Sequence, residues 1–76
     1  MEKQPLRLHG KSMRLLRVNH GLNGVQMGKE IGVSKAYVSM CETNIRILSA
    51  EKTKKFLEVI GITEDEARAF VEVVGY

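Results

Sequence analysis

The 76-residue chain has room for one domain with one core, and its 43% hydrophobic and 28% charged residues argue against disorder. Cys41 is the only cysteine, so no internal disulfide can form, and the two histidines lack a metal-ligand spacing, so we expect no metal and no cofactor. No apolar run approaches the ~20 residues of a membrane span, and the first residues do not resemble a signal peptide, so we expect a cytoplasmic protein that does not enter a membrane.

The net charge of +3 is distributed unevenly along the chain. Residues 1–22 carry five basic side chains against one acid, whereas residues 49–76 carry four bases against six acids. Such asymmetry is typical of a module that presents one basic face to a polyanion, although an ordinary solvated surface explains the charge equally well.

Residues 1–8 are expected to form an irregular arm, because Pro5 disfavours helix in the residue before it. A first helix is expected from Lys11 to a stop at Gly21, since glycine adopts the left-handed conformation without steric cost. Its apolar face is predicted from residues at i, i+3 and i+4 spacings, which are Met13, Leu15, Leu16 and His20.

A second helix is expected after Asn23, whose side chain is a good N-cap, with Leu22 stapled onto Met27. Met27 and Ile31 share the core face of this helix. Gly28 lies on or near that face, which indicates either simple tolerance of a glycine or a second helix that crosses closely there.

The chain breaks its helix at Gly32 and restarts it at Ser34, which predicts a tight turn between two helices, with Val33 plugging the turn. The third helix is expected to run to about Thr43, and Asn44 tolerates the left-handed conformation that would end it. The side chains of this helix divide into an inward pair, Val38 and Cys41, and an outward set, Lys35, Ala36, Ser39 and Met40.

Two further helices complete the prediction. Ser49 caps the fourth helix, which ends at Gly61, and residues 63–66 form a capping box that opens the fifth. The apolar faces are Thr53, Phe56, Leu57 and Ile60 in the fourth helix, and Ala67, Phe70, Val71 and Val74 in the fifth. Five short helices without a convincing strand predict an all-α fold.

The stretch from Leu22 to Asn44 resembles the helix-turn-helix of the lambda-repressor-like, Cro-type family, also called the XRE family, and the likeness extends over roughly residues 11–62. It rests on Arg17, an arginine late in the first helix, and on matched features of the motif. These features are Leu22-Asn23, Gly28, Gly32-Val33-Ser34, Val38, Ser39 and Glu42. The resemblance implies a five-helix lambda-repressor-like bundle, in which residues 9–76 form a single helix-turn-helix domain with a C-terminal helix.

The resemblance also implies which residues contact double-stranded DNA, because the helix after the turn lies in the major groove. Lys35 can donate to guanine, and Ala36 can pack on a thymine methyl. Met40 can contact thymine methyls or only shield part of the protein surface. Tyr37 can bind a phosphate or pack on the core. Asn23 can bind a phosphate or serve only as the N-cap of its helix. The implied base-reading residues are Lys35, Ala36, Ser39 and Met40, and the implied phosphate contacts are Asn23, Tyr37, Thr43 and Arg46.

The family pairs an arginine with a glutamate across the first and third helices, so we expect Arg17 and Glu42 to form a partly buried, mainly structural ion pair. The chain departs from the family pattern elsewhere. Gly24 stands where glutamine is usual, which removes a phosphate contact and leaves the DNA affinity open. Asn44 replaces a glycine, the following loop lacks the common proline, and Cys41 replaces a larger apolar residue, either as core packing or as a redox switch.

These features predict a sequence-specific DNA-binding transcriptional regulator, a small repressor of phage or mobile-element type that binds a pseudo-palindromic operator as a homodimer. The alternative is an adaptor or antitoxin of the same fold that binds an antirepressor, a co-regulator or a toxin. We expect no enzyme, because the chain has no nucleophile–base pair, no paired carboxylates on one face and no phosphate-cradling glycine loop. The expected dimer surface lies on the fifth helix, at Phe70, Val71, Val74 and Tyr76, and the alternative for this helix is ordinary packing onto the core, which must account for at least part of it.

Overall fold

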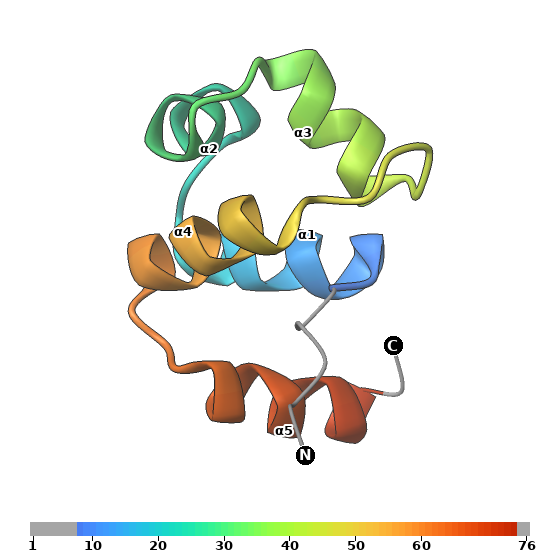
Figure 1. The fold of residues 1–76 in the computed structure, drawn as a ribbon, viewed down its shortest axis with the longest axis vertical. Coiled ribbons are helices and arrows are strands. Elements are labelled where there is room, and N and C mark those ends of the chain that lie inside the picture. Colours follow the sequence, from blue (N-terminus) through green and yellow to red (C-terminus); the bar gives the residue numbers. More distant parts are fainter. Residues whose placement is uncertain (1–7, 75–76) are drawn as a thin grey trace.

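The computed structural model describes residues 8–74, which fold into five α-helices with no strand among them, as the sequence predicts (Figure 1). The helices are α1 (Gly10–Asn19), α2 (Gly24–Ile31), α3 (Lys35–Glu42), α4 (Ala50–Ile60) and α5 (Glu64–Val74). Residues 1–7 of the expected arm, and Tyr76 of the expected dimer surface, lie outside the described residues. No helix within residues 8–74 has the length and the apolar character needed to cross a membrane.

Side-chain caps start four of the helices at the residues that the sequence predicts. Each cap oxygen accepts a hydrogen bond from the backbone N–H three positions later, at 2.8 to 3.1 Å, and the caps are Asn23, Ser34, Ser49 and Thr63. The predicted capping box of Thr63 and Glu66 is present, and a second box that the sequence analysis missed joins Asn23 and Gln26. The cap of α1 is His9, whose Nδ1 accepts from a backbone N–H of the first turn at 3.2 Å.

Two helices of the motif end where the backbone turns left-handed. Gly32 has a φ of 81° at the end of α2, a conformation in which glycine is needed because other residues rarely adopt it. Asn44 has a φ of 63° and is the only described non-glycine residue with a positive value. The expectation that Asn44 would take this conformation after α3 is confirmed.

One core joins all five helices. Leu48 is 4% exposed although it lies outside every predicted apolar face, and the other buried hydrophobic residues come from those faces. Leu22 and Val33 pack against this core from the turns on either side of α2. The buried hydrophobic residues are Met13, Met27, Ile31, Val38, Cys41, Leu48, Phe56, Leu57 and Ala67.

Two residues expected on the apolar face of α1 are not there. Leu15 is 42% exposed and His20 is exposed, so this part of the prediction was wrong. The buried face of α1 instead centres on Ser12 and Met13, with Leu16 half-buried. Leu15 follows Met13 by two residues, which turns its side chain about 200° around the helix and away from the buried face. His20 is the C-cap and lies beyond the last helical residue.

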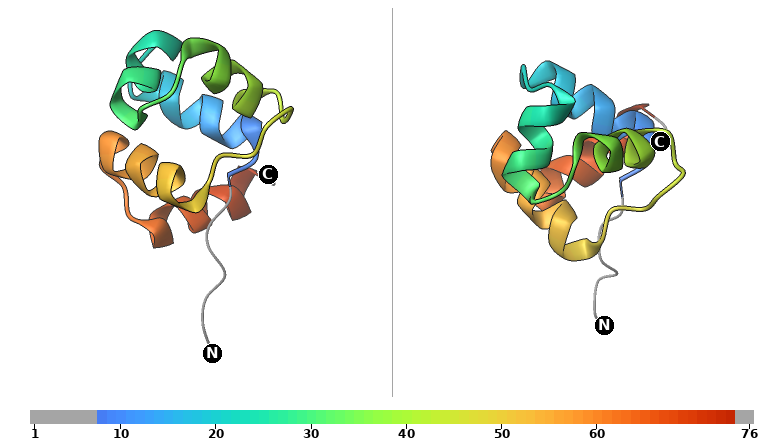
Figure 2. Two further views of the ribbon diagram at one scale, coloured as in Figure 1. Left: turned by 45° about the horizontal axis from the view of Figure 1, so that its top comes forward. Right: turned by 90° about the horizontal axis from the view of Figure 1, so that it is seen from above.

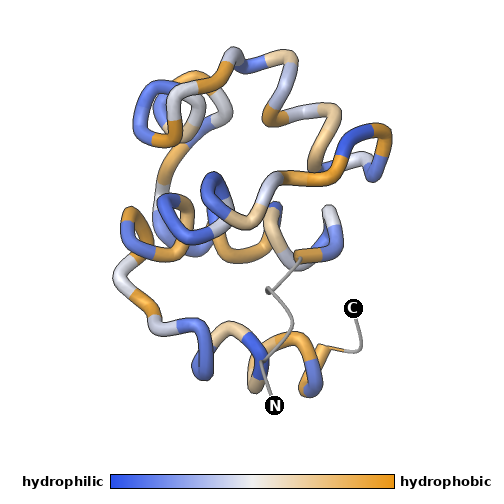
Figure 3. Tube along the Cα trace, viewed as in Figure 1, coloured by the Kyte–Doolittle hydropathy of each residue, from blue (hydrophilic) through white to orange (hydrophobic). Residues whose placement is uncertain are grey.

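The helices lie in layers along the long axis of the molecule (Figure 1). α2 and α3 occupy one end, α1 and α4 the middle, and α5 the other end, as the first rotated view in Figure 2 also shows. α5 buries fully only Ala67, while Phe70, Val71 and Val74 of its predicted face are half-buried. Polar and apolar residues are interspersed along every helix (Figure 3), and the buried apolar residues form the side that packs on the core.

Candidate nucleic-acid interface

The turn between α2 and α3 folds back tightly on Gly28. The backbone N–H groups of Gly32 and Val33 both donate to the carbonyl oxygen of Gly28, each at 2.8 Å. A Cβ atom on Gly28 would lie 2.5 Å from the carbonyl oxygen of Val33, closer than a close-packed structure allows. Glycine is therefore required here for a close approach, and the approaching segment is the backbone of the turn rather than the crossing helix that the sequence analysis considered.

α3 presents two different faces because of where its apolar residues fall. Val38 and Cys41 are 1% and 3% exposed and anchor α3 to the core, as predicted. The opposite side is exposed except at its half-buried methionine, and it consists of Lys35, Ala36, Ser39 and Met40. α3 lies at the surface when the molecule is viewed from its α2–α3 end (Figure 2). The helix thus has the accessible side that contact with a duplex requires.

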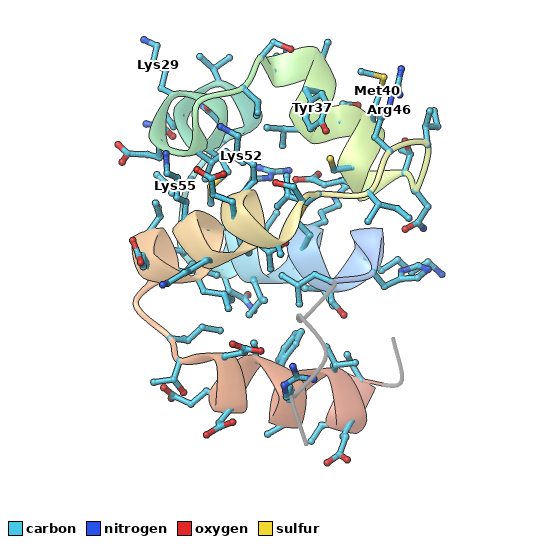
Figure 4. The ribbon with its side chains drawn as sticks, viewed as in Figure 1. Lys29, Tyr37, Met40, Arg46, Lys52 and Lys55 are labelled. Atoms are coloured by element: carbon cyan, nitrogen blue, oxygen red, sulfur yellow. The ribbon has the colours of Figure 1, made fainter. Side chains whose placement is uncertain are left out.

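The loop that follows α3 returns to the last turn of that helix. The N–H groups of Ile45 and Arg46 both donate to the carbonyl oxygen of Met40, at 2.9 and 3.2 Å. Figure 4 shows the side chains of Met40 and Arg46 near each other at this end of α3. The fold thereby brings one residue of the predicted base-reading set next to one of the predicted phosphate contacts.

Two other residues of the predicted phosphate set make contacts within the chain. The hydroxyl of Thr43 lies 3.0 and 3.3 Å from the carbonyl oxygens of Ser39 and Met40, to which it donates at the end of α3. Tyr37 is half-buried and packs against the core, which was one of its two interpretations. Part of Tyr37 stays accessible, so core packing and contact with a phosphate are compatible.

The start of α2 lies beside the start of α3. The backbone N–H of Asn23 donates to Oε1 of Gln26 at 2.9 Å, and Oδ1 of Asn23 accepts from the backbone N–H of Gln26 at 2.8 Å. The Nδ2 group of Asn23 is therefore the part of its side chain that is left to donate to a phosphate. A Cβ atom on Gly24 would meet the Cγ of Lys35 at 3.4 Å and no other atom within 4 Å. Gly24 therefore leaves open the space beside Lys35 that a glutamine side chain would enter.

Arg17 and Glu42 form the ion pair that the sequence analysis expected between α1 and α3. The guanidinium donates to both carboxylate oxygens, from Nε at 2.5 Å and from Nη2 at 3.0 Å, and Nη1 donates to the carbonyl oxygen of Leu22 at 2.8 Å. The two side chains are 13% and 9% exposed. The hydrogen bond to Glu42 raises the pKa of Arg17 further above its ordinary value, against the opposing effect of burial. One side chain thus ties the end of α3 to α1 and to the α1–α2 turn.

Cys41 is a core residue with a buried thiol. Burial, reinforced by the negative charge of Glu42, raises the pKa of this thiol. Because the thiolate is the reactive form, a buried thiol of raised pKa favours core packing over the redox switch. Within residues 8–74, no group of three or more His, Cys, Asp and Glu side chains could hold a metal ion.

A contact that the sequence did not predict joins the end of α3 to the start of α1. Oδ1 of Asn44 accepts a hydrogen bond from the backbone N–H of Gly10 at 2.9 Å, and its Nδ2 lies 3.1 Å from Nε2 of His9. A Cβ atom on Gly10 would collide with the carbonyl group of Glu42, so only glycine fits there. The available signal was the asparagine itself, which brings a hydrogen-bonding side chain to a position where the family usually has glycine.

Comparison with known proteins agrees with this geometry. A family model described as "Helix-turn-helix" matches residues 13–66, which run from within α1 to the first turn of α5 and make up more than half of the chain. No curated protein and no solved structure matches the chain.

Proposed function

Because the chain belongs to the XRE-type helix-turn-helix family of DNA-binding regulators, we propose that it is a small repressor of phage or mobile-element type that reads a pseudo-palindromic operator through α3. The observation that carries this proposal is the exposure of Lys35, Ala36 and Ser39 on the side of α3 opposite its buried anchors.

Lys35 is the residue best suited to recognise a base. Its ammonium group donates only, and guanine presents two acceptors, O6 and N7, in the major groove. Lys35 makes no ion pair with any described residue, and it lies in the first turn of α3, the end at which recognition helices contact base edges. Ala36 and Met40 then offer apolar contact to thymine methyls, and Ser39 can bond to either kind of base.

The proposed phosphate contacts surround this base-reading side. Arg46 is exposed in the loop after α3, and Asn23 offers its Nδ2 at the start of α2. Tyr37 adds a hydroxyl group from α3, and Thr43 adds one just after α3, which must turn from the Ser39 and Met40 carbonyl oxygens to donate to a phosphate. Contacts of this kind hold the helix in its register on the duplex but carry no sequence information, so they contribute affinity rather than the choice of operator.

A homodimer is part of the proposal, because one α3 reads only about half of a pseudo-palindromic site. The surface that we propose for it is α5, where Phe70, Val71 and Val74 are half-buried and Val73 is 87% exposed. Burial of such an exposed valine against a partner removes apolar area from water and would stabilise a dimer. Tyr76, two residues beyond Val74 in sequence, belongs to the same proposed surface.

A second function, binding to another protein, is favoured by a different observation. Ile45 and Ile47 are 71% and 65% exposed in the loop after α3, which returns to Met40. An antirepressor, a co-regulator or a toxin could cover this apolar loop. Salt separates the two functions: a DNA complex with ~6 phosphate contacts loses about a thousandfold or more in affinity between ~50 and ~200 mM salt, whereas an apolar protein complex changes little.

The experiment that tests the proposed function is selection of the fragments that the full chain binds from random duplex DNA. An inverted repeat with half-sites about one helical turn apart would support both the reading helix and the dimer. A selected sequence without such a repeat would support DNA reading and reject the pseudo-palindromic operator. Failure to enrich any sequence at low salt would reject DNA reading and favour the protein partner.

A further inference from the structure

α4 places a lysine against the turn of the helix-turn-helix. Lys52 lies in the first turn of α4 and is half-buried, and its ammonium nitrogen would be 3.2 Å from a Cβ atom on Gly32. Gly32 ends α2 just before α3 begins. Although α4 follows the motif in sequence, its lysine therefore reaches the turn that positions the exposed side of α3.

Two further lysines lie on α2 and α4. Lys29 of α2 and Lys55 of α4 are exposed, and in Figure 4 Lys55 lies with Lys52 between α2 and α4, while Lys29 projects from the other side of α2. We call these three residues the α2–α4 basic edge. None of them makes an ion pair with another residue of the described chain. The edge therefore presents positive charge that is open to an anion from outside.

The acidic part of the chain lies at the far end. α5 carries four acids, Glu64, Asp65, Glu66 and Glu72, against the single base Arg68. Figure 1 places α5 at the opposite end of the long axis from α2 and α3. A polyanion is therefore attracted to the α2–α3 end and kept away from α5, which favours a nucleic acid as the partner of the basic edge.

The two sides of α3 have different neighbours. One side carries Lys35, which lies beside Gly24 at the start of α2. The same side carries Glu42, which pairs with Arg17 of α1. Tyr37 projects from the other side, about 200° around the helix from Lys35, and Figure 4 shows it on the face of the molecule that carries Lys52. A helix in the major groove has phosphates of both strands beside it, and the groove is about 12 Å wide.

We propose that the α2–α4 basic edge binds the phosphate backbone of one DNA strand while the start of α2 faces the other strand. This inference rests on the proposed function, because it requires α3 to lie in the major groove. Lys52 is its central residue, since its ammonium group already lies at the turn. A lysine acts on phosphate as a point charge, so the edge strengthens binding to any duplex and selects no sequence.

The test compares Lys52→Ala with Lys54→Ala in the full chain, on the selected operator and on a random duplex of equal length. Lys54 is a matched control, because it lies on the same helix but borders the groove between α4 and α5, together with Glu58 and Glu64. Lys52→Ala is expected to weaken both complexes by the same factor and to lower the slope of log affinity against log salt by about one. Lys54→Ala is expected to change neither quantity, and Lys52→Arg should keep the slope because it keeps the charge.

Three results would overturn the inference. Equal losses in Lys52→Ala and Lys54→Ala would mean that net charge acts, rather than a located contact. A loss confined to the operator would make Lys52 a base reader, and an unchanged salt slope would remove it from the interface. In each case the proposed function survives if Lys35→Ala still relaxes base preference, whereas an unmodified chain that binds neither duplex would reject both.

Thermal unfolding of each variant is measured first. Lys52→Gln, which keeps most of the side-chain stem and removes the charge, replaces the alanine variant if that variant is unfolded at the assay temperature. The same slope change of about one is then expected.

Discussion

Asn44 bonds to Gly10 across 34 positions of sequence, with its side-chain oxygen accepting the glycine N–H at 2.9 Å. The asparagine ends α3 in the left-handed conformation, and the glycine begins α1. Two residues earlier, Glu42 is paired with Arg17 of α1. The C-terminal end of the proposed reading helix is therefore fixed to α1 at two points, one near each end of α1.

Asn44→Gly is expected to lower the free energy of unfolding by about 0.5–1.5 kcal/mol, the usual net value of one hydrogen bond, because glycine keeps the backbone conformation and loses the side chain. Asn44→Ala should cost about 1–2 kcal/mol more, because alanine is also strained in that conformation. Chemical denaturation measures both. A glycine variant as stable as the unmodified chain would show that the bond to Gly10 contributes nothing.

Removing one partner of the Arg17–Glu42 pair, by Arg17→Ala or Glu42→Ala, is expected to destabilise the chain by about 3–5 kcal/mol, because a nearly buried charge loses its partner. The double variant Arg17→Met, Glu42→Leu should recover most of this loss. The control is the exposed pair of Arg68 and Glu64, where Glu64→Gln should cost no more than about 0.5 kcal/mol. Equal effects at the two pairs, measured by denaturation, would contradict a buried structural role.

Gly28→Ala and Gly24→Ala should change stability in opposite directions. At Gly28 the new methyl would meet the Val33 carbonyl oxygen at 2.5 Å, and forcing the turn apart should cost about 1–3 kcal/mol. At Gly24 it would meet only the flexible Cγ of Lys35, so the lower entropy of the unfolded chain should stabilise by about 0.4–1 kcal/mol. Melting temperatures report the difference, and a tolerated Gly28→Ala would mean that the turn can open.

Lys35→Ala should weaken binding to the selected operator by about 1–3 kcal/mol and relax preference at one base pair, because a specific donor to a base edge is lost. Competition binding against single-base-pair variants of the operator measures both effects. A preference that stays unchanged at every position would remove Lys35 from the base-reading set and leave it as a phosphate contact or a solvated charge.

Val73→Lys should weaken dimerisation without lowering the stability of a single copy, because the side chain is 87% exposed and only a partner could bury it. Sedimentation over a range of concentrations measures the dimer. The matched control is Ile45→Lys in the exposed loop after α3, which should leave the dimer intact. The opposite pattern would move the interface from α5 to that loop.

The helix ends and the turn could be predicted because their signals are local. Ser34 caps the N–H of Tyr37 three residues away, and Gly32 is the residue of the turn that can adopt the left-handed conformation without steric cost. Val38 and Cys41 could be placed inward by the helical repeat alone, which left the other side of α3 for the solvent.

The residues alone were enough to predict the five helices, the caps of four of them, the turn and the outward side of α3, since each depends on residues within about four positions of one another. Only the tertiary structure decided that Leu48 is buried, that Leu15 is exposed, that Asn44 meets Gly10 and that Lys52 reaches Gly32. The helical repeat gives the spacing of an apolar stripe but neither its centre nor its neighbours, because those depend on how the helices pack against one another.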